Sequence, residues 1–140
     1  MKILIAVDGS SYTKRMLAYL AAHDEWLSAG HSFTVVHAVP PVPARAAAVL
    51  DKALLKDYYA DEGEKVLKTI RTFFAKQKIA AEFVVKVGSP AEVIATAADK
   101  GRYELLMLGS HGHGAFGNLV LGSVTTKVMA NCRAPVLLIR

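Results

Sequence analysis

Apolar residues gather along the chain in five short, nearly continuous runs, and longer segments of mixed polarity separate them. A continuous apolar run of about four to eight residues is typical of a strand that is buried on both faces of a parallel sheet. We therefore expect strands at residues 2–7, 33–39, 81–87, 104–108 and 134–139.

The segments between these runs carry apolar residues at helical spacing. Met16, Leu17 and Leu20 lie near one face of the first segment. In a later segment, Ser89 is suited to the N-cap of a helix and Pro90 to its first position. We expect helices at residues 12–28, about 47–77, from 90 onward and at 123–131, with an irregular proline-rich connector at 40–48.

Strict alternation of strands and helices predicts an α/β fold. We expect a doubly wound, five-stranded parallel sheet of order 3-2-1-4-5 with helices on both faces. The strand order then reverses between the first and fourth strands, and ligands of such folds bind beyond the carboxyl ends of the strands at that reversal. Val7 and Asp8 would there face Leu108 and Gly109.

Length and composition fit one domain over residues 1–140. The chain is 53% hydrophobic and 21% charged, so it can form a core without disulfides or metals. Its single cysteine, Cys132, excludes an internal disulfide and fits a reducing cytosol. No apolar run approaches the ~18 residues of a spanning helix, so we expect a cytoplasmic protein with no membrane partner.

The net charge of +5 raises the question of nucleic-acid binding. The lysines and arginines are scattered over the predicted helices, however, and form no basic tail. None of the common nucleic-acid recognition motifs is present. We expect solvated helix faces and no nucleic-acid partner.

Residues 109–125 are rich in glycine, and two familiar nucleotide motifs fail there. Gly112, Gly114 and Gly117 match G-x-G-x-x-G, but no acidic residue follows Glu104 to hold the ribose of a dinucleotide. Gly117 and Gly122 have the spacing of a P-loop, but Ser123 stands where its lysine is needed. Neither a Rossmann site nor a P-loop is expected.

A third arrangement uses Gly109, Gly112, Gly122 and Ser123 at the spacing G-x2-G-x9-G-S. Gly109 is expected just past the fourth strand, where the absence of a Cβ lets a ligand approach the backbone. Ser123 is the expected N-cap of the last helix, which leaves the N–H groups of Val124, Thr125 and Thr126 free for an anion. The hydroxyls of Ser123, Thr125 and Thr126 are expected as further donors. This pattern predicts a phosphate site.

On these residues the chain resembles the ATP-binding subgroup of the universal stress protein family. The resemblance covers nearly the whole chain: ILIAVDGS, VVHAV, GSPAEVIATAA, ELLMLGSHG and GSVTTKVMANCRAPVLLIR. It implies a fold like that of the adenine nucleotide alpha hydrolases. It also implies ATP bound at the reversal of strand order, together with Mg²⁺ or Mn²⁺, and a homodimer formed through the last strand.

The resemblance also implies a role for each matching position. Two positions differ from the residues common in the family, because Leu108 replaces a methionine and Ala38 replaces a valine. The residues expected to contact the nucleotide are Ala6, Val7, Asp8, Ala38, Leu108, Gly109, His111, Gly112, Gly122, Ser123, Val124 and Thr125.

Three side chains allow more than one interpretation. Asp8 could cap the first helix, bind a ribose hydroxyl, or hold a phosphate-bound metal through water. His111 and His113 are too few for a zinc site, and no metal ligand set is expected, but either histidine could contact a phosphate. His37 is expected to be a hydrogen-bonded core histidine.

No catalytic residue is predicted, because the chain has neither a P-loop lysine nor an assured catalytic carboxylate. The sequence favours a nucleotide-binding stress-response or regulatory protein. Two alternatives remain: a slow ATPase or nucleotide hydrolase, and a protein-interaction module whose pocket is empty or holds another ligand.

Overall fold

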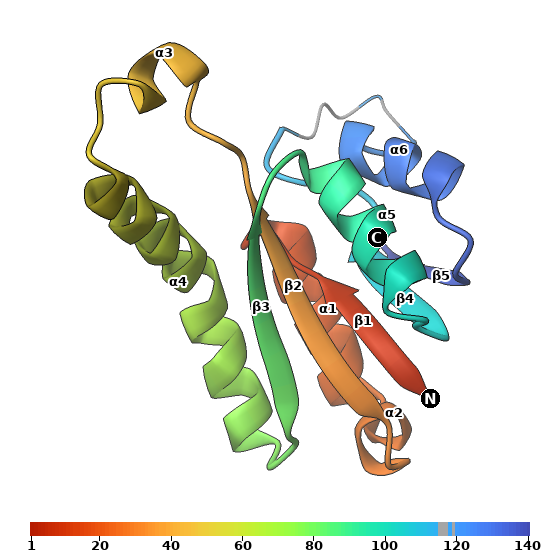
Figure 1. Ribbon diagram of the computed structural model, residues 1–140. Helices are drawn as coiled ribbons and strands as arrows, with labels where there is room; N and C mark the ends of the chain where they lie inside the picture. Colours follow the sequence, from red (N-terminus) through yellow and green to blue (C-terminus); the bar gives the residue numbers. More distant parts are fainter. Residues whose placement is uncertain (115–117, 119) are drawn as a thin grey trace.

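A five-stranded parallel sheet forms the centre of the molecule (Figure 1). The computed structural model describes residues 1–114, 118 and 120–140. The strand order is β3-β2-β1-β4-β5, and every neighbouring pair is parallel, which confirms the predicted topology. The strands are β1 (Lys2–Ala6), β2 (Ser32–Val39), β3 (Ala81–Val87), β4 (Leu105–Gly109) and β5 (Val136–Ile139).

Helices cover both faces of this sheet, as the alternation of elements predicts. On one face α1, α2 and α4 pack, and on the other α5 and α6 lie side by side (Figure 1). The helices are α1 (Ser11–Ala22), α2 (Asp24–Ser28), α3 (Ala44–Ala47), α4 (Lys52–Lys76), α5 (Pro90–Lys100) and α6 (Ser123–Asn131). None of the helices in these described ranges is long and apolar enough to cross a membrane.

Each face of the sheet has its own hydrophobic core. Successive residues of β1 alternate between them: Ile3 and Ile5 pack beneath α1 and α4, whereas Leu4 and Ala6 pack beneath α5 and α6. All four side chains are at most 6% exposed. Burial on both faces explains why the central strands β1, β2 and β4 are mostly apolar, with Thr34 and His37 of β2 as buried polar exceptions.

Two helices predicted as continuous are divided in the structure. The segment 12–28 breaks at His23, whose backbone leaves the helical region at φ −124° and ψ 72°. The segment 47–77 contains the end of the short α3 and then the long α4. Asp51 separates these two helices, because its extended backbone and its carboxylate, which accepts from the Ala53 N–H, begin α4 anew.

The carboxyl end of β4 also differs from the prediction. Gly109 is the last residue of the strand, opposite Ile139 of β5, rather than the first residue beyond it. Ile5 of β1 pairs with Met107 of β4. This parallel register brings the residues that follow β1 next to the end of β4, at the reversal of strand order.

Candidate functional site

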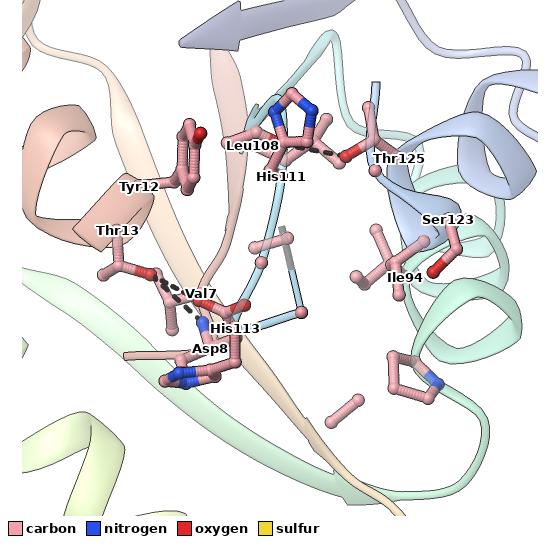
Figure 2. A pocket seen from close by; sticks show the side chains of 18 of the residues that line it. Val7, Asp8, Tyr12, Thr13, Ile94, Leu108, His111, His113, Ser123 and Thr125 are labelled. Carbon is pink, nitrogen blue, oxygen red and sulfur yellow. Dashed lines mark hydrogen bonds between the residues drawn. The ribbon is translucent and has the colours of Figure 1, made fainter. Parts of the chain in front are cut away.

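A cavity of about 470 Å³ opens at the carboxyl ends of β1 and β4. It lies at the reversal of strand order, where the topology predicts a ligand. In Figure 2, Asp8, Tyr12 and Thr13 line one side of it, and Ile94 and Ser123 lie opposite. All twelve predicted contact residues line this one cavity: Ala6, Val7, Asp8, Ala38, Leu108, Gly109, His111, Gly112, Gly122, Ser123, Val124 and Thr125.

Asp8 orders the turn between β1 and α1. Its Oδ1 accepts the N–H of Ser10 at 2.9 Å and the hydroxyl of Thr13 at 3.1 Å. The Thr13 hydroxyl in turn accepts the N–H groups of Asp8 and Gly9 at 3.1 and 3.2 Å (Figure 2 draws Asp8 and Thr13). The N-cap position of α1 is Ser10, so Asp8 stabilises the turn without being the N-cap itself.

The second carboxylate oxygen of Asp8 faces the glycine-rich segment. A Cβ placed on Gly112 would lie 2.6 Å from Asp8 Oδ2, so the missing side chain makes room for the carboxylate. Within the described residues Oδ2 accepts no hydrogen bond. Asp8 therefore presents one oxygen to its own turn and keeps the other for the cavity.

The remaining glycines differ in what their missing side chains allow. A Cβ on Gly109 would lie 2.6 Å from the Cβ of Tyr12, so this glycine lets α1 pack against β4. The prediction that its missing Cβ opens an approach for the ligand is therefore wrong. A Cβ on Gly122 would lie 3.0 Å from the Cα of His111, whereas one on Gly114 would meet nothing within 4 Å.

The N-terminus of α6 forms the opposite wall of the cavity. Gly122, with φ −71° and ψ 163°, is its N-cap, and Ser123 is the first helical residue, so the predicted N-cap at Ser123 is wrong. The N–H groups of Ser123, Val124 and Thr125 have no acceptor within the helix. The predicted donor Thr126 is not free, because its N–H donates to the carbonyl of Gly122 at 3.0 Å.

Two of the three hydroxyls in this first turn already have partners. Thr125 Oγ1 donates to the carbonyl of Gly109 at 2.9 Å, which ties α6 to the end of β4 (Figure 2). Thr126 Oγ1 donates to the carbonyl of Gly122 at 2.9 Å. Within the described residues, the Ser123 hydroxyl is the one in this turn that makes no hydrogen bond.

Three histidines line the cavity, and their hydrogen bonds fix two of their tautomers. The buried His37 donates from Nδ1 to the carbonyl of Val7 at 2.8 Å, which confirms that this histidine is hydrogen-bonded. His113 donates from Nε2 to the carbonyl of Asp8 at 2.7 Å. The ring of His111 lies 5.1 Å from that of Tyr12, centroid to centroid, and its Nδ1 is 3.0 Å from Ser110 Oγ.

The charge of the cavity wall is low. Asp8 is the one acidic side chain among the described lining residues, and they include neither lysine nor arginine. Over residues 1–114, 118 and 120–140, no three histidine, cysteine or acidic side chains are grouped closely enough to hold a metal ion. Backbone N–H groups and hydroxyls are therefore the main donors toward the cavity among the described residues.

The groups with perturbed pKa values lie outside this cavity. Burial raises the pKa of the Cys132 thiol, and the nearby Asp99 carboxylate adds to the effect. This cysteine is partly buried at the end of α6, as expected of a packed residue. The hydrogen bond from Lys65 to Glu62, at 2.6 Å on the outer side of α4, raises the pKa of that lysine.

Several lining residues are not among the twelve predicted contacts. Tyr12 and Thr13 could have been suspected, because they follow Asp8 in the turn that enters α1. The others come from β2, from the segments after β2 and β3, and from the segment after β4. The additional lining residues are Tyr12, Thr13, His37, Pro40, Pro90, Ile94, His113 and Gly114.

Comparison with known proteins places this geometry in context. The model of the "Universal stress protein family" matches residues 1–140. A universal stress protein of Thermus aquaticus is 36% identical over 139 residues, which is 99% of this chain and 97% of that protein. A universal stress protein of Methanocaldococcus jannaschii is 30% identical over 148 residues, covering 99% and 81%.

Solved structures share the fold. Universal stress protein UspA from Lactobacillus plantarum aligns with a TM-score of 0.79 at 22% identity, over 100% of this chain and 97% of that one. A universal stress protein from Archaeoglobus fulgidus in complex with dAMP aligns with a TM-score of 0.69 at 24% identity, over 100% of this chain and 98% of that one. A universal stress protein family protein from Arabidopsis thaliana with AMP bound aligns with a TM-score of 0.69 at 16% identity. The alignment covers 99% of this chain and 90% of that one.

Proposed function

The chain belongs to the universal stress protein family, and from this membership and the geometry of its cavity we propose that it is a regulatory stress-response protein that binds ATP with Mg²⁺ or Mn²⁺. One observation carries the proposal. A single cavity at the reversal of strand order is lined by every residue of the predicted nucleotide set, including the N-terminus of a helix. Structures of this fold with bound dAMP and AMP support an adenine nucleotide as the ligand.

The apolar part of the cavity suits the adenine base. Ala38 and Leu108 are 7% and 3% exposed, and Ile94 of α5 closes the wall behind them. A flat aromatic base gains from burial against such side chains, because the apolar area leaves water. Ala38 is small enough to leave the base room beside β2.

The ribose is placed beside Asp8. Oδ2 has no hydrogen-bond donor within the described residues, whereas Oδ1 is held by Ser10 and Thr13. A carboxylate oxygen that is fixed in direction and lacks a donor is suited to accept a ribose hydroxyl. Gly112 leaves the space through which Oδ2 faces the loop.

The phosphate end is placed at the start of α6. The N–H groups of Ser123, Val124 and Thr125 and the free hydroxyl of Ser123 are donors there. The helix dipole adds a partial positive charge at the same point. The hydrogen bond from Thr125 to Gly109 holds this turn against the end of β4.

A regulatory role is favoured over catalysis by the donor set. The described cavity residues include no lysine to neutralise charge on a transferred phosphoryl group. We place the protein in the cytosol, where its partly buried thiol would stay reduced. A homodimer through the edge strand β5 completes the proposal.

The test is isothermal titration calorimetry with ATP and Mg²⁺ on the wild type and on Ser123→Glu. Ser123 is an exposed first-turn residue, so a glutamate there favours the helix dipole and leaves folding intact. Its carboxylate would compete with the phosphates for the same N–H groups, and we expect affinity to fall at least tenfold. Met129→Glu, which adds the same charge near the other end of α6, is the control.

If Ser123→Glu and Met129→Glu bind ATP with equal affinity, the placement of the phosphates at the start of α6 is refuted. If the wild type gives no binding heat with ATP and no adenine nucleotide competes for the site, the proposal that the protein binds an adenine nucleotide is refuted. Thermal unfolding of all three proteins shows that each is folded under the conditions of the titration.

A further inference from the structure

The wall that would surround the phosphates has no fixed positive charge. No lysine or arginine occurs between Tyr103 and Thr126, and this holds for every residue of that segment because it is read from the sequence. The described residues that line the cavity likewise include neither type. In contrast, sites that hold polyphosphates commonly use a lysine or arginine for the outer phosphates.

Basic side chains close to the described cavity residues are placed for other contacts or exposed to solvent. The guanidinium of Arg15 stacks over the ring of Tyr12, 4.8 Å from its centroid, and so lies one residue outward from the cavity wall. Lys127 is an exposed residue of α6, beyond the turn that faces the cavity. At about 0.15 M salt the Debye length is about 8 Å, so surface charges farther than this from the phosphates contribute little inside the cavity.

Among the described residues, the neutral donors are enough for one phosphate group but not for three. The first turn of α6 offers three N–H groups and the hydroxyl of Ser123, while the hydroxyls of Thr125 and Thr126 already donate elsewhere. Asp8 adds a full negative charge to the same cavity. Each further phosphate therefore adds negative charge that the wall does not balance.

Building on the proposed adenine-nucleotide site, we infer that this cavity ranks its ligands by phosphate charge. Without a divalent cation AMP binds more tightly than ADP, and ADP more tightly than ATP. Asp8 is the specificity-determining residue, because it is the one acidic side chain among the described lining residues. The expected difference between AMP and ATP is about three- to tenfold, from like charges in a partly solvated site.

A divalent cation changes this order through the ligand. The described residues hold no group of three metal-ligating side chains, so the cation must arrive on the phosphates. Mg²⁺ fits this arrangement, since it commonly uses one or two carboxylates, several waters and substrate phosphates. Neutralising two phosphate charges should bring the affinity for ATP up to that for AMP.

The experiment is calorimetric titration of the wild type with AMP, ADP and ATP at about 0.15 M salt, first in EDTA and then in Mg²⁺. The matched variants are Asp8→Asn and Asp57→Asn, which remove the same charge. The amide that replaces the carboxylate in Asp8→Asn keeps an oxygen for the N–H of Ser10 and the hydroxyl of Thr13. Asp57 is exposed on α4 and does not line the cavity.

The inference predicts the order AMP, ADP, ATP in EDTA, and loss of that order in Mg²⁺. Asp8→Asn should reduce the ratio of AMP to ATP affinity at least twofold, whatever happens to the affinities themselves, and Asp57→Asn should leave the ratio unchanged. ATP binding most tightly in EDTA, or a ratio that Asp8→Asn does not change, would overturn the inference while leaving the proposed function intact. Binding of none of the three nucleotides would overturn the proposed function first, and the inference with it.

Discussion

At the scale of single residues, one short turn determines much of the proposed site. Asp8 would be free to rotate if only its position after β1 were fixed. The Thr13 hydroxyl prevents this, because it donates to Asp8 Oδ1 and accepts two backbone N–H groups. Oδ2 is thereby left facing Gly112 and the cavity.

Thr13→Val tests the importance of this hydroxyl. The change conserves shape but leaves the N–H groups of Asp8 and Gly9 without their acceptor, and Thr13 is 5% exposed. We expect the free energy of unfolding to fall by about 1–3 kcal/mol and nucleotide affinity to fall with it. Urea denaturation and calorimetry measure the two effects.

Thr72→Val is the control for that substitution. Its hydroxyl donates to a carbonyl of the preceding helical turn at an exposed position of α4, so its loss should have little effect. Equal stability of the two variants would show that the turn at Asp8 does not depend on the Thr13 hydroxyl.

The residue scale also shows where sequence reasoning reached its limit. The spacing of Gly109, Gly112 and Gly122 identified glycines that line the cavity, but the reason given for Gly109 was wrong. Its missing Cβ makes room for Tyr12 of α1. A contact between residues so far apart in sequence depends on helix packing, which spacing alone does not reveal.

At the scale of elements, the close approach of α1 to the end of β4 depends on Gly109. The side chain of Tyr12 occupies the space that a Cβ would need, and the backbone of α1 lies directly behind it. We expect Gly109→Ala to lower stability by about 1–3 kcal/mol, because overpacking must be relieved by movement of the helix. Thermal unfolding measures this shift.

Gly114→Ala serves as the matched control, since a Cβ there meets nothing within 4 Å. An unchanged melting temperature is expected for it. Should Gly109→Ala melt like Gly114→Ala, the packing explanation would be refuted. A larger side chain at position 109 would also disturb the packing of α1. Loss of nucleotide binding in such a variant would therefore not by itself locate the nucleotide.

The elements differ in how well the sequence predicted them. The buried strands were predicted within about two residues, because burial on both faces imposes a continuous apolar run. The two long predicted helices were not predicted as well, because each is divided in the structure. Around residues 47–50, good helix formers lie on both sides of the break, so the sequence does not reveal it. Asp51 begins a new helix as its N-cap, and helix propensity averaged over the segment does not reveal this local effect.

At the scale of the whole molecule, the order of the strands follows from the alternation of elements and the right-handed crossover rule. The same topology predicts the location of the cavity. It does not predict which loop residues of other strands reach that cavity. Pro40, Pro90 and Ile94 enter it from the segments after β2 and β3, and only coordinates show that these segments converge.

The edge of the sheet leads to a prediction about assembly. The carbonyl of Pro135 accepts from Leu106 of β4, and that of Ile139 accepts from Ser110, the residue after β4. Alternation along β5 therefore directs the N–H of Leu138 away from the sheet. If dimers form by pairing of two β5 edges, Leu138→Pro should remove an outward donor and leave the pairing with β4 in place. Sedimentation velocity should then show a dimer for the wild type and a monomer for the variant.

A monomeric wild type, or a Leu138→Pro variant that remains a dimer, would refute pairing through β5. Circular dichroism and thermal unfolding of the variant establish that its sheet is retained. An exposed strand edge is otherwise a template for uncontrolled association, so the oligomeric state also bears on solubility.

The most direct test of the central claim is a ¹H–¹⁵N correlation spectrum of the labelled protein titrated with AMP. We expect the phosphate on the N–H groups of Ser123, Val124 and Thr125 and the ribose beside Asp8. The amides of these four residues should show the largest shifts, while amides at the far end of the sheet, such as that of Lys2, stay unchanged. Saturating AMP that leaves the first turn of α6 unshifted, or that shifts another surface instead, would contradict this expectation.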